Sequence, residues 1–153
     1  MKKLPVLFGI FVAIIVAGTT FAEVEVKEAP LTWQQAALTD GEELYLELCA
    51  VCHGTGGKGD GPAAPAMTKP VPDLSILAAR NDGKFPREVV EDSIAGKSRV
   101  VAHGTIDMPI WGQVFENAAR SDWKEFRREG FAKQRVYNLT EYIATIQVEY
   151  GQP

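Results

Sequence analysis

Apolar residues recur at helical spacing in two widely separated stretches of the chain. In the first, Leu44 and Leu48 share one face of a helix expected from Gly41 to Cys52, which a Thr39–Glu42 capping box opens. In the second, near the C-terminus, the apolar positions are Val136, Leu139, Ile143 and Ile146. No stretch alternates with the period of a β-strand, and no internal repeat is found. The pattern therefore predicts helices.

Weaker signals surround these two helices. Thr32 and Gln35 form a capping box for a short helix through Leu38, and Trp33 is expected to cover the core. Residues 114–134 are polar and mixed in charge, which predicts one or two surface helices. Their aromatic side chains Trp123 and Phe126 are expected to pack inward.

The middle of the chain predicts short elements and loops. Asp73 is placed to cap a short helix over 74–79. Pro86 suits the first turn of another helix, which Gly96 ends. Its inward positions are Val89, Val90 and Ile94. Residues 100–111 show no clear period and are expected to form a loop.

The N-terminus carries an export signal. Lys2 and Lys3 precede an apolar run, and Thr20-Phe21-Ala22 has the small-x-small form of a cleavage site. Residues 1–22 are therefore predicted to be a signal peptide, with an uncleaved membrane anchor as the alternative, because the run is long enough to cross a bilayer. Residues 23–39 are expected to be an extension and residues 40–150 the functional domain. The body of the protein is exported, and the periplasm is the predicted location.

The charge balance limits the partners. The whole chain has 16 basic and 20 acidic residues, a net charge of −4. Removal of residues 1–22 takes away two lysines and leaves 14 basic residues, so the net charge becomes −6. This argues against binding of nucleic acid or of an anionic membrane by the body of the protein. It favours partners with a basic docking surface.

The chemistry is concentrated in Cys49-Ala50-Val51-Cys52-His53, which holds both cysteines of the chain. A C-x-x-C-H run is typical of covalent haem attachment. On a helix, Cys49, Cys52 and His53 lie on one face, so two thiols can form thioethers while the imidazole binds the iron. Three other uses of these residues fit the sequence less well. A zinc site needs more ligands, a thioredoxin-like pair needs a βαβ pattern, and a disulfide across this helical turn would be strained.

Residues 54–61 contain five glycines. Residues 54–59 match G-x-G-x-x-G, but a helix precedes them and Pro62 follows, so a dinucleotide site is excluded. Gly59 also stands where a phosphate-binding P-loop needs Ser or Thr. We expect a loop that approaches the haem ring closely, where side chains would collide with it.

A haem iron held by His53 has a sixth position that is either ligated or open. The candidate ligands are Met67, His103 and Met108. Met108 is preferred, because the following Pro109 stiffens its loop. Met67 is expected to touch the edge of the ring, and His103 to form a hydrogen bond with the backbone.

With these motifs the sequence resembles the class I c-type cytochromes, and more closely their exported bacterial monohaem members. The matching residues are Cys52 to Gly54, Gly59 to Pro62, Pro70 to Leu74 and His103 to Gly112. The segment between Gly112 and the last helix is longer than in the small members.

The resemblance implies an all-α cytochrome c fold, with helices packed around one covalent haem c and with the first and last helices crossing. It also implies that the Pro62 carbonyl accepts a hydrogen bond from His53 Nδ1. Trp111, Lys97 and Arg99 are candidate neighbours of the haem.

The function expected from the resemblance is single-electron transfer between redox proteins, without catalysis, through a haem ligated by His53 and Met108. Two alternatives remain at this point: a tightly bound cytochrome subunit of a periplasmic oxidoreductase, and a haem protein with an open iron site.

Overall fold

In a computed structural model of the chain, residues 32–97 and 108–148 are described, and they all belong to one compact unit. This part of the chain forms helices and turns and contains no strand, as the sequence predicts. The α-helices are α1 (Trp33–Leu44), α2 (Ala50–His53), α3 (Arg87–Ala95), α4 (Trp111–Ala118) and α5 (Glu125–Thr145). A π-helical turn, η1 (Tyr45–Cys49), joins α1 to α2, and two 3-10 turns are η2 (Ala64–Ala66) and η3 (Ala79–Asn81).

The predicted signal peptide, residues 1–22, lies outside the described residues. Among the residues that are described, no helix combines the length and the apolar character needed to span a bilayer.

The first helix begins where the sequence predicts but does not stop there. The Thr32–Gln35 capping box is present. The predicted Thr39–Glu42 box is wrong, because the Thr39 hydroxyl donates to the Gln35 carbonyl oxygen at 3.1 Å and the helix continues through it. Helix α1 thus runs across the expected boundary between extension and domain. Trp33 is 72 % exposed and does not cover the core.

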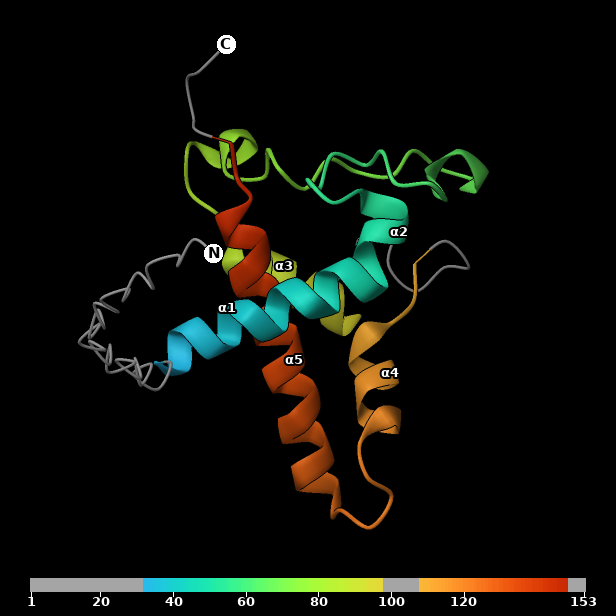
Figure 1. The fold of residues 1–153 in the computed structure, drawn as a ribbon, viewed down its shortest axis with the longest axis vertical. Helices are drawn as coiled ribbons and strands as arrows, with labels where there is room; N and C mark the ends of the chain where they lie inside the picture. Colours follow the sequence, from blue (N-terminus) through green and yellow to red (C-terminus); the bar gives the residue numbers. More distant parts are fainter. Residues whose placement is uncertain (1–31, 98–107, 149–153) are drawn as a thin grey trace, which may run out of the picture. The chain divides into compact units, whose positions relative to one another are not determined.

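Helix α1 crosses α5, which confirms the predicted contact between the first and last helices (Figure 1). Leu44, Leu139 and Ile143 are buried where the two helices meet. Gly41 lies at the closest point, where a Cβ atom would clash with the backbone carbonyl of Asn138. The crossing therefore brings backbone against backbone.

Helices α3 and α4 cover the remaining apolar side of α5. In α3, Val90 and Ile94 are buried as predicted, and Gly96 ends the helix with φ of 76°. Val89 is 57 % exposed, because it lies one position away from the inward face of the helix.

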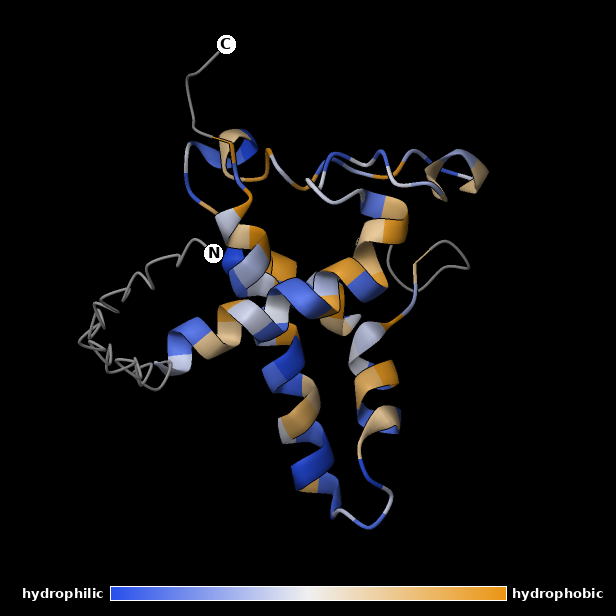
Figure 2. Ribbon diagram, viewed as in Figure 1, coloured by the Kyte–Doolittle hydropathy of each residue, from blue (hydrophilic) through white to orange (hydrophobic). Residues whose placement is uncertain are grey.

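The segment predicted as surface helices consists of α4, a turn and the first half of α5, which is mostly hydrophilic (Figure 2). Its inward aromatic residue is Phe115, only 1 % exposed, and not Phe126, which is 66 % exposed. Trp123 packs edge-on against Phe131, with ring centroids 5.8 Å apart. The prediction for Phe126 was wrong because the polar pattern here has no helical period that marks an inward face.

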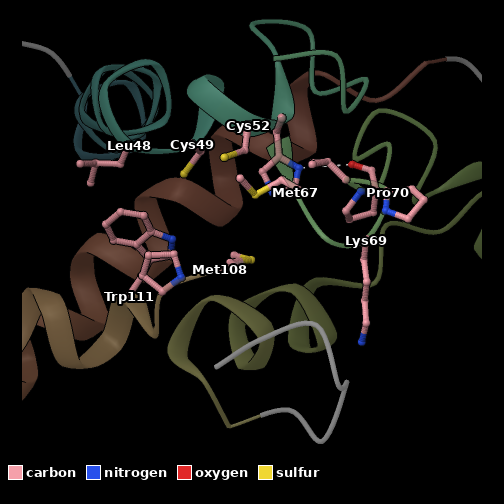
Figure 3. A pocket seen from close by; sticks show the side chains of 12 residues that line it. Leu48, Cys49, Cys52, Met67, Lys69, Pro70, Met108 and Trp111 are labelled. Carbon is pink, nitrogen blue, oxygen red and sulfur yellow. Dashed lines mark hydrogen bonds between the residues drawn. The ribbon is translucent and has the colours of Figure 1, made fainter. Parts of the chain in front are cut away.

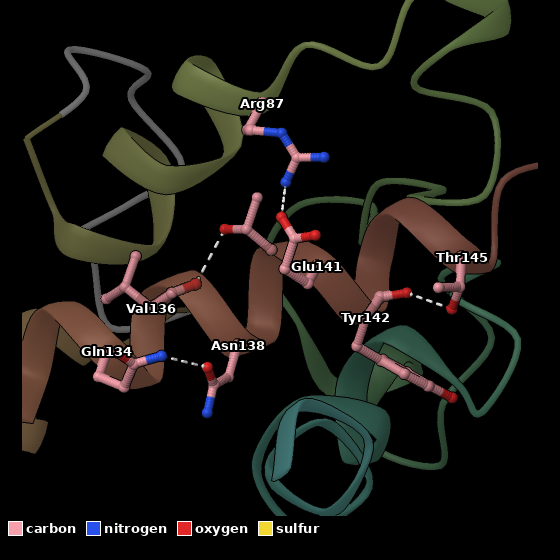
Figure 4. Close-up of polar contacts among 8 residues, drawn as sticks. Arg87, Gln134, Val136, Asn138, Glu141, Tyr142 and Thr145 are labelled. Atoms are coloured by element: carbon pink, nitrogen blue, oxygen red, sulfur yellow. Dashed lines mark hydrogen bonds and ion pairs between the residues drawn. The ribbon is translucent and has the colours of Figure 1, made fainter. Parts of the chain in front are cut away.

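Polar contacts fix α5 to its neighbours (Figure 4). Arg87 of α3 forms an ion pair with Glu141. Within α5, Gln134 donates to Asn138 at 2.7 Å. Beyond the helix, Gln147 Nε2 donates to the Leu74 carbonyl oxygen at 2.7 Å, which ties the C-terminal end to the middle of the chain.

Asp73 accepts hydrogen bonds from Ser75 at the start of a turn, and the α-helix that it was predicted to cap does not form. Its carboxylate accepts hydrogen bonds from the Ser75 backbone N–H at 2.8 Å and from the Ser75 hydroxyl at 2.6 Å. The residues that follow form turns and the 3-10 turn η3 in place of an α-helix over 74–79.

Candidate functional site

A continuous helical rod delivers the two cysteines and the histidine. Helix α1 packs its apolar face on α5 and passes without a break into η1, which ends at Cys49, and then into α2, which carries Cys52 and His53. A π-turn takes more residues per turn than an α-helix, and such turns often occur at functional sites. Here it changes the phase of the rod, so that residues before it face α5 while Cys49, Cys52 and His53 line a pocket.

Twelve of the described residues line the pocket, and most of them are apolar (Figure 3). Cys49 and Cys52 lie on one wall, Met108 lies across from them, and Trp111 is at one end. The hollow is open to solvent on one side. Two thiols, an imidazole and a thioether around this apolar hollow fit a covalently attached haem.

The imidazole of His53 is buried and oriented by a backbone carbonyl. Nδ1 lies 3.2 Å from the Pro72 carbonyl oxygen. A carbonyl oxygen can only accept, so Nδ1 carries the proton and Nε2 is the basic nitrogen that can bind a metal. An outer-shell acceptor of this kind fixes both the tautomer and the ring orientation.

The acceptor is therefore not the carbonyl of Pro62, and this prediction is corrected. The Pro62 segment serves another purpose, because its neighbours cap the end of α2. Gly61 N–H donates to the Cys52 carbonyl oxygen at 3.1 Å, and Ala63 N–H donates to that of Val51 at 2.9 Å. These bonds hold Pro62 at the end of the helix.

The glycine-rich loop packs against the chain itself, and none of residues 54–61 lines the pocket. A Cβ on Gly59 would clash with the Val71 carbonyl, and Leu74 N–H donates to the Gly57 carbonyl oxygen at 2.6 Å. Gly59 also has φ of 76°, which favours glycine. The loop thus packs against residues 71–74 and holds the Pro72 carbonyl beside His53. The sequence pattern instead predicts that this loop approaches the haem ring.

Only some of the residues predicted as iron ligands or haem neighbours line the pocket. Met67 and Met108 both line the pocket, as does Trp111, whose ring stacks on that of Phe115 at 5.9 Å. Lys97 lines a different hollow, between α3, α4 and α5. Arg99 and His103 lie outside the described residues.

The electrostatics of the pocket disfavour the thiolate form of Cys49. Burial, followed by the nearby Cys52, raises the pKa of the Cys49 thiol to about 12. Thiolates are the species that bind zinc and attack disulfides, and this pocket disfavours them. Among the described residues, no group of three or more His, Cys, Asp and Glu side chains is arranged to hold a metal ion.

Sequence reasoning missed Pro72 and Lys69. The available signal for Pro72 was Pro70-Val71-Pro72, since such a run favours an extended chain whose carbonyls are not used in a helix. Among the described residues, Lys69 contributes the one permanently charged side chain of the pocket lining, at the opposite end from Trp111 (Figure 3). No pattern in the sequence marks Lys69.

Comparison with known proteins gives one match. The family model described as Cytochrome c matches residues 38–147. No curated protein and no solved structure matches the chain.

Proposed function

This chain belongs to the cytochrome c family, whose members transfer electrons through bound haem, and we propose that it is a periplasmic carrier with one haem iron held by His53 and Met108. Its cofactor is one haem c, covalently bound through the Cys49-x-x-Cys52-His53 motif. Met108 is proposed as the sixth ligand because it lines the same pocket as His53 and because the following Pro109 stiffens its loop.

The observation that carries this proposal is the composition of the pocket. Cys49, Cys52, His53 and Met108 line the same hollow, and Lys69 is the one permanently charged residue among the described residues there. Within residues 32–97 and 108–148, the lining includes no carboxylate or hydroxyl that would act as a general base or nucleophile. Such a pocket suits an electron carrier better than a catalyst.

The residues of the chain set the conditions for electron transfer. When bound, the haem supplies a one-electron couple. His53 is held in one orientation through the Pro72 carbonyl, so little rearrangement is needed when the charge changes. The apolar lining limits access of water, and a thioether ligand favours the reduced state, so we expect a fairly positive reduction potential.

Substitution of Met108 tests the ligand assignment. In Met108→Ala holoprotein we expect the low-spin absorption spectrum to be lost, carbon monoxide to bind, and the reduction potential to fall, because the sixth ligand is gone. Met67→Ala is the matched control, since it removes a thioether from the same pocket. Met67→Ala and His103→Ala should both keep the low-spin spectrum. If His103→Ala opens the iron and Met108→Ala does not, the ligation is by two histidines.

Mass spectrometry of the exported holoprotein tests the location. We expect the mass of the chain from Glu23 plus one haem, because the cleavage pattern ends at Ala22. Recovery from the periplasmic fraction is the matching result. A mass that includes residues 1–22, with the protein in the membrane fraction, would establish an anchored form.

A further inference from the structure

Positive charge gathers at one end of this acidic protein. The rod from Trp33 to Cys49 carries four acidic residues and no basic one. By contrast, the connection between α4 and α5 and the first four residues of α5 (residues 119–128, called the hairpin tip) contain four basic and two acidic residues, a net charge of +2. The net charge of the whole chain hides this separation.

Three of the basic side chains at the hairpin tip have no ion pair in the part of the chain that the structure describes. Arg120 is paired, since its guanidinium donates two hydrogen bonds of 3.0 Å to the Asp122 carboxylate. The contact with Arg120 also lowers the pKa of Asp122, so this pair is neutral as a unit. Lys124, Arg127 and Arg128 remain, opposed only by Glu125 within the tip.

An exposed aromatic ring lies among these cations. Phe126 is 66 % exposed, and the Arg127 guanidinium lies 6.0 Å from the centre of its ring. Trp123, half-buried, packs on Phe131 and supports the turn. Large aromatic residues beside Lys and Arg are the composition of segments that lie at the surface of a bilayer, with the rings at the acyl boundary and the cations among the headgroups.

The hairpin tip is separate from the haem pocket. Trp111, the first residue of α4, lines the pocket, and the eight residues of α4 carry the chain about 12 Å along the helix axis at 1.5 Å per residue. A surface bound at the tip would therefore leave the mouth of the pocket accessible to a redox partner.

We propose that the hairpin tip docks on an anionic membrane surface. The acidic residues of α1 do not prevent this. Asp40 of α1 meets Asn138, which lies ten residues, or about 15 Å along the axis of α5, from Arg128. Charges more than about 10 Å apart are largely screened at an ionic strength of about 0.1 M. The exposed ring of Phe126 in the first turn of α5 favours insertion into a lipid surface over contact with an acidic protein. The net negative charge of the protein opposes binding to anionic lipid, but the hairpin tip gives the protein one local surface of positive charge.

The test uses exported holoprotein and two sets of vesicles, phosphatidylcholine alone and phosphatidylcholine with phosphatidylglycerol. Co-sedimentation measures the partition coefficient on each set of vesicles. The ratio used is the coefficient on the vesicles with phosphatidylglycerol divided by that on phosphatidylcholine alone. An uncleaved N-terminal segment would bind both vesicles, so the ratio isolates the charge-dependent part. Each basic residue near the surface contributes about fivefold to partitioning. Arg127→Gln/Arg128→Gln should therefore lower the ratio by about 25-fold.

Two further variants make the test specific. Phe126→Ala should weaken binding to anionic vesicles about tenfold, because the ring no longer enters the acyl boundary. Lys58→Gln/Lys84→Gln changes the net charge equally at two exposed residues outside the tip and should leave the ratio unchanged. Haem spectra and thermal unfolding of all variants confirm that each is folded.

Three outcomes would overturn the proposal. The wild type could show a ratio near one, or the tip variants could keep the wild-type ratio. Alternatively, the protein could be retained on immobilised poly-glutamate through the tip without binding anionic vesicles, which would assign the tip to an acidic protein partner.

Discussion

Tyr45 joins the helical rod to the loop that follows His53. Its side chain is fully buried, and its hydroxyl donates a hydrogen bond of 2.7 Å to the Gly54 carbonyl oxygen. The ring also lies 5.2 Å from that of Tyr142. Burial, more than the nearby acidic groups, raises the pKa of the Tyr45 phenol. One side chain thus connects helix packing to the position of the haem-binding histidine.

Tyr45→Phe should lower the free energy of unfolding of the holoprotein by about 1 kcal/mol at neutral pH, because it removes the hydrogen bond and keeps the ring. Tyr142→Phe is the matched control, in the partner ring of the same pair, and should cost clearly less. Denaturant unfolding followed by the haem spectrum measures both. Equal losses in the two variants would show that the hydrogen bond to Gly54 contributes nothing measurable.

The same tyrosine predicts a dependence on alkaline pH. The unfolded phenol ionises near pH 10, while the folded one keeps its proton, so the native state binds more protons and stability falls above about pH 10. Tyr45→Phe has no phenol at this position and does not show this loss. The difference in free energy of unfolding between wild type and variant should therefore become smaller between pH 9 and about pH 11. A difference that stays constant over this range would contradict the raised pKa.

The crossing of α1 and α5 is the element on which the site depends. It fixes the direction of the rod, and η1 then turns the cysteines toward the pocket. Gly41 allows the close approach of the two helices because it has no Cβ atom to meet the Asn138 carbonyl. A polar pair of side chains, Asn138 and Asp40, also spans the crossing, 3.4 Å apart.

Gly41→Ala should destabilise the holoprotein by about 1–3 kcal/mol, the usual cost of overpacking. Gly130→Ala is the control, because it lies within α5 with no neighbouring atom within 4 Å of an added Cβ. It should increase stability by about 0.5–1 kcal/mol through its better helix propensity. Thermal unfolding of the two variants distinguishes packing from propensity. If both gain stability, the helices are free to move apart.

At the scale of the whole molecule, charge is distributed unevenly. Four exposed acidic residues occupy the rod that ends at Cys49, close to the haem, whereas basic residues gather at the hairpin tip. We therefore expect an electron-transfer partner that approaches along the rod to meet a negative field, which extends over about one Debye length.

The rate of oxidation by a cationic reagent, such as tris(phenanthroline)cobalt(III), should fall as ionic strength rises, because salt screens this attraction. Glu43→Gln/Glu47→Gln should reduce the salt dependence, since both residues are exposed on the rod. Asp82→Asn/Glu88→Gln is the control with equal charge change elsewhere, and stopped-flow kinetics measures all three proteins. A rate that is independent of salt would indicate docking on an apolar face.

The sequence by itself determined the chemistry of the cofactor and the helical class of the fold. Cys49, Cys52 and His53 lie within about one helical turn, so local geometry alone brings them to one face. The last helix was predictable for a similar reason, because an apolar stripe at helical spacing must be covered by another element.

Tertiary structure decided which partners these elements meet. The resemblance implied that the Pro62 carbonyl accepts from His53, and nothing in the sequence indicates that Gly61 and Ala63 cap α2. Sequence reasoning placed Phe126 inside, where Phe115 is buried, because a polar segment carries no period. It ended a short helix at Leu38, yet Thr39 donates to the backbone and the helix continues. Each of these outcomes depends on contacts between residues distant in sequence or on local alternatives of similar energy, whereas spacing within one turn is fixed by the helix itself.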